Sequence, residues 1–254
     1  CDAYLDWCAE QRVSPRVLAM AAHLFHLSPE QGRSHLLTLL AHARARGVCV
    51  EVVALADTRS YPTLTIEPHV TEIGALCTAA GNACLELGNE VLPIHGTQSD
   101  RLTPDYLVSL ARLVPASVPV SLGSTHGGAE EDPTLARLAR QFPNGYATAH
   151  DTRTDDENGW KFVRHPNDLG ALADHDWIYV LNDEPKRADL DPGKHLGTAL
   201  VCRIRDIGDT FHYGGGLHAT IPEGAELAAF TARKRGWDLI PEDWVGAYRN
   251  TGQA

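Results

Sequence analysis

An acidic run near the middle of the chain has the residue types that bind a divalent cation. His150-Asp151 is followed, after three residues, by Asp155-Asp156-Glu157-Asn158. Carboxylate oxygens are the ligands that hard cations such as Mg²⁺ and Ca²⁺ take in proteins. The same composition is typical of a solvated acidic loop, which is the more common structure for such a run. The run therefore predicts either a cation-binding segment or a loop exposed to water.

A glycine pair offers a different kind of binding site. His126-Gly127-Gly128 follows shortly after the apolar segment 118–122. Successive backbone N–H groups in a glycine turn can bind an oxyanion or a phosphate, and ligands of parallel α/β proteins bind at the carboxyl ends of the strands. The alternative is a tight glycine turn that binds nothing.

The cysteines and histidines do not add a predicted metal centre. The chain has 6 cysteines and 13 histidines, and none has the C-x-x-C or H-E-x-x-H spacing of a zinc site. Most cysteines have apolar neighbours, which is typical of small buried side chains in a reducing cytoplasm. Cys1 stands where self-processing hydrolases carry a nucleophile. However, residues 2–9 have the pattern of an amphipathic helix, whereas such nucleophiles usually begin a strand. The apolar surroundings of most cysteines lead us to predict a cytoplasmic protein.

The segments that must position these residues alternate between strand and helix. Strands alternating with helices indicate an α/β fold with a mainly parallel central sheet and helices on both faces. We expect a single domain over residues 1–254, in which 144–194 is an insertion or lid. The predicted strands are 16–25 (with the turn after it), 48–55, 90–94, 118–122, 177–181 and 200–204, and the predicted helices are 28–46, 71–87, 103–112, 133–141 and 225–235.

The last third of the chain carries an ordered series of short motifs. His195-Leu196-Gly197-Thr198 is followed by Arg205-Asp206-Ile207-Gly208-Asp209, then by a segment beginning Ala225-Glu226-Leu227 and by Trp237-Asp238-Leu239 near the end. This series resembles the cis-prenyltransferase family (undecaprenyl diphosphate synthase and relatives), which carries H-L-Y-T, R-T-S-G-E, A-E-L-Y-F-T and W-P-D-F in this order. The segments 87–91, 101–104 and 118–128 resemble earlier motifs of the same family.

The resemblance implies roles for individual residues, and it has clear departures. The family's first-strand M-D-G-N, whose Asp binds magnesium diphosphate, is replaced by Met20-Ala21-Ala22-His23. The family's S-T-E-N element is replaced by Ala56-Asp57-Thr58-Arg59. Another acid would therefore have to hold Mg²⁺, either Asp57, Asp209 or a carboxylate of the 151–157 loop. The implied catalytic residues are Asp57, Arg205 and Asp209, with Asp209 as the metal ligand, and the implied substrate-binding residues are His23, Arg59, His126, Gly127, Gly128 and Gly208.

Three functions follow as alternatives. The first is a divergent enzyme that acts on isoprenoid (allylic) diphosphates by irregular coupling or by ionisation and cyclisation, because the loss of the first-strand Asp argues against ordinary chain elongation. The second is a non-catalytic subunit of an active cis-prenyltransferase. The third is an unrelated α/β hydrolase or binding protein. We prefer the enzyme because Arg205, Gly208 and Asp209 are retained together.

The overall charge restricts the partners. The chain has 33 Asp+Glu against 22 Lys+Arg, a formal net charge of -11. A nucleic-acid-binding protein normally needs a basic face, so we expect no nucleic-acid partner. No apolar run reaches the roughly 20 residues of a membrane helix. We expect an isoprenoid diphosphate substrate and a homodimer, with a heteromer containing another prenyltransferase as the alternative.

Overall fold

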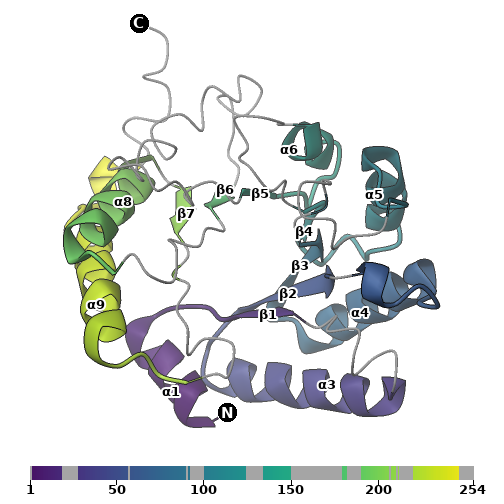
Figure 1. Cartoon of the computed structure of the whole chain (residues 1–254), viewed down its shortest axis with the longest axis horizontal. Helices are drawn as coiled ribbons and strands as arrows, with labels where there is room; N and C mark the ends of the chain where they lie inside the picture. Colours follow the sequence, from purple (N-terminus) through teal and green to yellow (C-terminus); the bar gives the residue numbers. More distant parts are fainter. Residues whose placement is uncertain are drawn as a thin grey trace, which may run out of the picture. The chain divides into compact units, whose positions relative to one another are not determined.

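The computed structural model describes the chain in stretches that form two compact units. The described residues are 2–18, 28–56, 58–89, 91, 100–123, 134–149, 179–181, 190–205, 207–209, 211 and 220–245. The first unit comprises Cys1–His126 and Leu138–Tyr146, and the second comprises Gly127–Arg137 and Ala147–Ala254. Figure 1 colours both units along the sequence. Most of the predicted insertion at 144–194 lies outside the described residues.

The first unit is built on a parallel four-stranded sheet with the strand order β1-β2-β3-β4. In its register, Val52 pairs with Leu85 and Leu85 pairs with Val120. These three side chains form one apolar row, and each is at most 1% exposed. The strands are β1 (Arg16–Leu18), β2 (Val50–Leu55), β3 (Ala83–Gly88) and β4 (Val120–Ser121).

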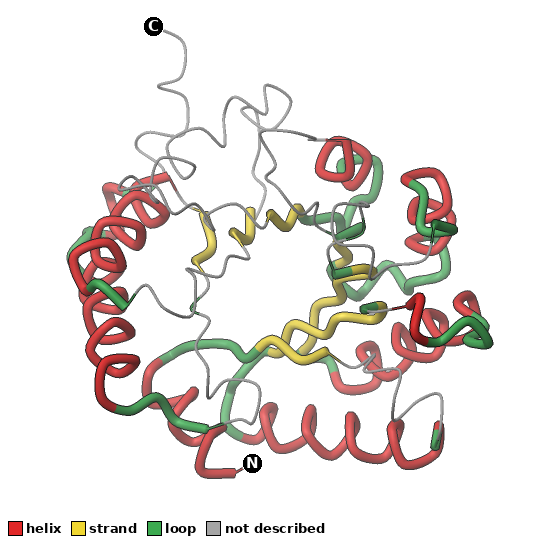
Figure 2. The backbone as a smooth tube through the Cα atoms, in the orientation of Figure 1, coloured by secondary structure: helices red, strands yellow, loops and turns green. Residues whose placement is uncertain are grey.

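Helices cover one side of this sheet. In Figure 2, α3, α4 and α5 lie on the same side of strands β1–β4. The prediction of helices on both faces is therefore not met by the described helices of the first unit. The helical segments of the first unit are α1 (Asp2–Gln11), α3 (Pro29–Ala45), the 3₁₀ turn η1 (Thr58–Ser60), α4 (Ile66–Ala80) and α5 (Pro104–Ala111). The short helix α6 (Thr134–Ala139) is divided between the two units, because the first unit resumes at Leu138.

Local sequence signals set the starts of two of these helices. In α5, Thr103 is the N-cap and its Oγ1 accepts a hydrogen bond from the backbone N–H of Tyr106 at 3.3 Å. Pro104 follows at the first helical position, where its missing N–H costs nothing. Ser28 and Pro29 begin α3 in the same order, although the Ser28 side chain makes no capping hydrogen bond. Both helix starts confirm the prediction.

The boundary between α4 and β3 corrects the prediction of a helix over 71–87. The predicted strand over 90–94 lies outside the described residues apart from Val91. Helix α4 ends at Ala80, because Gly81 adopts a left-handed conformation (φ 70°) and its N–H caps the helix on Cys77 O. Residues Ala83–Gly88 then form β3. Alanine, cysteine and leucine are compatible with either structure, so the pairing of this segment with β2 decides the outcome.

The second unit contains a second parallel sheet, with the strand order β5-β6-β7. The prediction of a strand ending at Leu181 is confirmed, whereas β5 lies in a region where no strand was predicted. The elements are β5 (Ala147–Ala149), β6 (Tyr179–Leu181), α8 (Pro192–Arg205), β7 (Ile207–Asp209), α9 (Gly224–Asp238) and the 3₁₀ turn η4 (Glu242–Trp244).

Helix α8 replaces the strand that was predicted over 200–204. Its buried residues His195, Thr198, Ala199 and Cys202 recur every three or four positions, which is the spacing of one helix face. This face packs against α9, where a Cβ added to Gly236 would lie 2.5 Å from Leu196 O. The close approach of the two helices therefore requires glycine at position 236.

The prediction of an α/β fold with parallel strands is confirmed. Each unit pairs its strands in parallel and carries helices. Among the described residues, no helix is both long enough and apolar enough to cross a membrane.

Candidate functional site

Strands β2 and β3 of the first unit end at the same level. Leu55, the last residue of β2, pairs with Gly88, the last residue of β3. The pairing continues one step further, because the N–H of Asn89 donates to Leu55 O at 2.8 Å. In the sequence, Asp57 follows Leu55 by two residues and Glu90 follows Gly88 by two residues. Both acids lie outside the described residues.

The segment on either side of Asp57 is compact. Ala56 and Thr58 are buried, with exposed fractions of 6% and 3%, and Tyr61 packs against Ala56. The N–H of Tyr61 donates to Thr58 O at 3.1 Å, which closes the turn η1. The residues directly before and after Asp57 in the sequence are therefore buried.

Strand β4 ends close to the backbone of β3. Gly123 has φ +115°, and a Cβ added there would lie 2.2 Å from Gly88 O. The N–H of Gly123 donates to Ser121 Oγ at 3.2 Å. Only glycine fits this conformation and this close contact. The carboxyl ends of β3 and β4 are thus held together by backbone contact.

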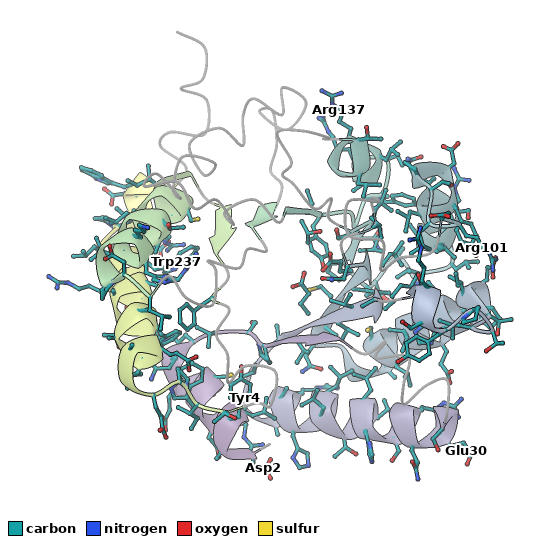
Figure 3. All side chains as sticks on the ribbon, viewed as in Figure 1. Asp2, Tyr4, Glu30, Arg101, Arg137 and Trp237 are labelled. Carbon is teal, nitrogen blue, oxygen red and sulfur yellow. The ribbon has the colours of Figure 1, made fainter. Side chains whose placement is uncertain are left out.

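Polar contacts connect the turn η1 with Asp100, before α5, and helix α4 with helix α5. Arg59 forms an ion pair with Asp100. The Tyr106 hydroxyl donates to Glu67 Oε1 at 2.5 Å, and the Arg101 guanidinium carbon lies 5.7 Å from the centre of the Tyr106 ring. Arg101 is labelled in Figure 3. The hydrogen bond from Tyr106 lowers the pKa of Glu67, while burial and the Glu67 carboxylate raise the pKa of Tyr106 to about 12.

Polar side chains also occupy the sheet of the first unit. Glu86 on β3 is fully buried. The Tyr146 hydroxyl donates to Glu51 Oε1 at 3.1 Å, and burial, followed by the charge of Glu51, raises the pKa of Tyr146 well above its usual value. Burial, with Glu51 as the next cause, raises the pKa of Cys84 to about 12. The Cys84 thiol is therefore protonated at neutral pH and is unsuited to act as a nucleophile.

These buried polar residues were not identified as functional from the sequence. Glu51 and Glu86 each stand between apolar residues in a short strand, and an acid in such a place is a detectable signal. Because residues 71–87 were predicted as a helix, the alternation around Glu86 was not interpreted as a strand with a polar face. Tyr146 lies 95 residues from Glu51, so sequence spacing gives no indication that they meet.

The residues implied by the family resemblance are only partly described. Among the implied positions, Arg59 is described and is bound to Asp100. Gly208 is half-buried in β7 and pairs with Val180. Arg205 is the last residue of α8 and Asp209 is the last residue of β7, and their side chains lie outside the described atoms. Also outside the described residues are His23, Asp57, His126, Gly127 and Gly128.

Of the acids that could hold Mg²⁺, only the backbone of Asp209 is described, whereas Asp57 and the 151–157 loop lie outside the described residues. The carboxyl end of a parallel strand is a suitable position for a metal ligand. Among the described residues, no group of three or more His, Cys, Asp or Glu side chains has an arrangement that fits a metal ion. The Mg²⁺ assignment remains a prediction from the resemblance.

Comparison with known proteins gives a likeness in fold. Neither a family model nor a curated protein sequence matches the chain. The catalytic domain of Thermobifida fusca endoglucanase Cel5A in complex with cellotetraose is 15% identical with a TM-score of 0.50, over 84% of this chain and 77% of that chain. D-psicose 3-epimerase from Clostridium cellulolyticum with D-tagatose is 12% identical with a TM-score of 0.50, over 98% of this chain and 93% of that chain. Both are TIM-barrel-like enzymes, and the likeness at these identities concerns the fold alone.

Proposed function

We propose that this chain is an enzyme that acts on a carbohydrate by acid–base catalysis at the carboxyl ends of β2 and β3. The observation that carries the proposal is the shared level of the two strand ends, Leu55 opposite Gly88. Each end is followed at the second residue by an acid, Asp57 after β2 and Glu90 after β3. Neighbouring parallel strands end at the same edge of a sheet, which is where such proteins bind their ligands, so we assign the two acids to one site on their sequence positions.

Two carboxyl groups on neighbouring strands suit the chemistry of sugars. Cleavage of a glycosidic bond uses one carboxylic acid that protonates the leaving oxygen and one carboxylate that acts as base or nucleophile. Epimerisation next to a carbonyl also requires a base that removes a proton and an acid that returns one. In both reactions, Asp57 and Glu90 are the groups that we expect to transfer the protons.

The likeness to solved structures supports the substrate class. One similar structure is a glucanase in complex with a cello-oligosaccharide, and the other is a sugar epimerase with a ketohexose. Enzymes with TIM-barrel folds carry their catalytic groups after the carboxyl ends of the strands. In the sequence, Asp57 and Glu90 each follow the end of a strand by two residues.

Action on an isoprenoid diphosphate is the alternative. It is supported by the order of the C-terminal motifs and by Asp209 at the carboxyl end of β7. In this alternative, Arg205 binds the diphosphate and Asp209 binds Mg²⁺. We rank it second because the strand that the sequence pattern predicted over 200–204, directly before Arg205, is part of helix α8. The non-catalytic subunit of an active cis-prenyltransferase is a separate prediction of the same resemblance, and the homodimer also remains a prediction.

A substrate screen with the full chain tests the proposal. The protein is incubated with cellotetraose and other oligosaccharides, with D-tagatose and other ketohexoses, and with farnesyl diphosphate plus isopentenyl diphosphate. Each reaction is run with and without Mg²⁺. Reducing ends, sugar isomers by NMR and released pyrophosphate are the three readouts. Asp57→Asn and Glu90→Gln are compared with Glu10→Gln, which makes the same change at an exposed residue of α1.

The outcomes separate the candidates. New reducing ends or a new sugar isomer, lost in E90Q or D57N but not in E10Q, support the proposal and identify the reaction. Release of pyrophosphate that is lost in Arg205→Ala, without any change to a sugar, supports the isoprenoid alternative instead. Sugar turnover that is unchanged in both D57N and E90Q contradicts the assignment of the site.

A further inference from the structure

Helices α8 and α9 of the second unit share a buried contact between a histidine and an arginine. Nη1 of Arg233 on α9 lies 2.8 Å from Nδ1 of His195 on α8. His195 is 2% exposed and Arg233 is 5% exposed. The two helices lie side by side in Figure 1. The contact between the two side chains is therefore shielded from water.

The chemistry of this pair determines the protonation state of the histidine. A guanidinium group has only N–H donors and stays protonated in proteins. Nδ1 of His195 must therefore accept the hydrogen bond from Arg233, and a ring nitrogen accepts only when it carries no proton. It follows that His195 is neutral when it is paired with Arg233, with its proton on Nε2.

Protonation of His195 would turn this attraction into repulsion. An imidazolium ring carries an N–H on both nitrogens, so two donors would face each other across 2.8 Å. Two cations would also stand in contact at a buried place, where little water screens their repulsion. Protonated His195 and Arg233 are therefore incompatible with the contact that the structure shows.

The packing around the pair leaves little room for a local rearrangement. A Cβ added to Gly236 on α9 would lie 2.5 Å from Leu196 O on α8, one residue after His195 and three residues after Arg233. The His195 ring also contacts Phe211 edge to face, with the ring centres 5.4 Å apart. Close-packed groups transmit strain to their neighbours. Separation of the two side chains therefore requires the helices to move apart.

Other charged groups belong to the elements around the His195 ring. They are Glu226 on the buried side of α9, Asp191 directly before α8, Lys194 on α8 and Asp209 at the end of β7, whose side chain lies outside the described atoms. Arg233 is in direct contact with the ring. A carboxylate that reached the ring would favour imidazolium instead, so the sign of the response to pH is the decisive measurement.

From these contacts we propose that His195 and Arg233 form a pH-sensitive switch, which holds α8 against α9 at neutral pH and releases it in acid. The open form accepts a proton on His195 more readily than the packed form does, so the packed form loses stability as the pH falls. Histidine is the side chain whose charge ordinarily changes in this range of pH. The switch goes beyond the proposed carbohydrate reaction and does not depend on it, because it uses no residue of that site.

The protonation of the His195 ring is the first test. NMR spectra of the full chain labelled with ¹⁵N-histidine distinguish a protonated from an unprotonated ring nitrogen, and the signals of His195 are assigned through its backbone. We expect Nδ1 to be unprotonated and Nε2 to be protonated at about pH 7.5. A proton on Nδ1 at this pH overturns the inference, because Arg233 then has no acceptor on the ring.

Amide hydrogen exchange measures the release of the helices. After correction for the chemical exchange rate, we expect the amides of α8 and α9 to exchange roughly tenfold faster at about pH 5.5 than at about pH 7.5. His195→Asn keeps an acceptor that does not titrate, and Arg233→Met removes the cation, so both variants should lose this dependence. Arg235→Met makes the same change at an exposed residue of α9 and should keep it.

The outcomes distinguish the switch from general unfolding in acid. His69→Gln changes a buried histidine of the first unit and should leave the response of α8 and α9 unchanged. Wild-type exchange that is independent of pH, or slower in acid, overturns the inference, and so does an equal response in R233M and R235M. If H195N or R233M does not fold at neutral pH, the ring protonation and the wild-type exchange decide.

Discussion

The hydroxyl of Tyr146 donates a hydrogen bond to Oε1 of Glu51 over 3.1 Å inside the first unit. Tyr146 is 5% exposed, and its backbone N–H also donates to Val120 O at 3.0 Å. The hydroxyl of buried Tyr146 and the carboxylate of half-buried Glu51 bind each other, which avoids the cost of an unsatisfied hydroxyl in the interior. This contact connects residues 95 positions apart in the sequence.

Removal of this hydroxyl is expected to destabilise the protein. Tyr146→Phe removes the hydroxyl that donates this partly buried hydrogen bond, so the free energy of unfolding should fall by about 1 to 3 kcal/mol. Urea unfolding followed by circular dichroism measures the change. Tyr106→Phe removes an equivalent phenol–carboxylate contact at an exposed position, where the loss should stay below about 1 kcal/mol. Equal effects of the two substitutions would contradict a buried contact at Tyr146.

His69 is expected to make stability depend on pH. Burial lowers the pKa of His69 below its usual 6.5, and its Nε2 lies 2.9 Å from Ala54 O. The unfolded chain therefore binds a proton at this residue more readily than the folded protein does. The stability that neutral His69 provides is fully present above pH 6.5 and is lost as the pH falls below 6.5 through the lower pKa of the folded state.

Urea unfolding at a series of pH values between about 5 and 8 tests this dependence. His69→Gln should flatten the fall in stability below pH 6.5, whereas His35→Gln, at an exposed position of α3, should not. A wild-type pH slope retained in H69Q would contradict the prediction.

Gly123 is expected to tolerate no side chain. Gly123→Ala combines a left-handed backbone with a Cβ placed 2.2 Å from Gly88 O, so we expect a loss of at least about 3 kcal/mol, typical of severe backbone defects. Gly81→Ala has φ +70° but no atom within 4 Å of the added Cβ, and should cost only about 1 to 2 kcal/mol. The difference between the urea midpoints of the two variants measures the destabilisation caused by the contact of the new Cβ with Gly88 O. Similar midpoints would show that this approach is loose.

The cysteines are expected to differ in their reactivity towards iodoacetamide. Burial raises the pKa of Cys8 to about 11 and the pKa values of Cys77 and Cys84 to about 12, so these thiols carry almost no thiolate at pH 8. Cys49 is exposed and should be alkylated first, as peptide mass mapping will show. In urea all four should react. Labelling of Cys84 as fast as Cys49 in the folded protein would contradict its burial.

Local signals determined some elements from the sequence alone. The order Thr103-Pro104 specifies the start of α5, because the cap and the proline act on the first helical turn itself. Gly47 likewise follows the end of α3, with φ +70°. These features depend on neighbours in the sequence, so the sequence is sufficient to predict them. The parallel α/β class followed in the same way from the alternation of segments.

The same reasoning did not find the residues that meet across the sheet. The predicted motif residues Arg205 and Asp209 lie on α8 and β7. The contact of Glu51 with Tyr146 and the ion pair of Arg59 with Asp100 were not predicted. Each of these contacts joins residues from different strands or loops, and their spacing in the sequence carries no information about distance. The candidate site at β2 and β3 therefore became visible only through the register of the strands.

The sequence by itself determined the acidic composition, the absence of a long apolar run and the helix starts, because each is a property of adjacent residues. Only the tertiary structure decided that Ala83–Gly88 is a strand and Pro192–Arg205 a helix. A strand is stabilised by its partners, and β3 exists because β2 and β4 lie on either side of it. Helix α8 is stabilised by the face that it buries against α9. In these segments, contacts with distant parts of the chain therefore override the local preference for helix or strand. The register of the strands also determines that β2 and β3 end at the same level.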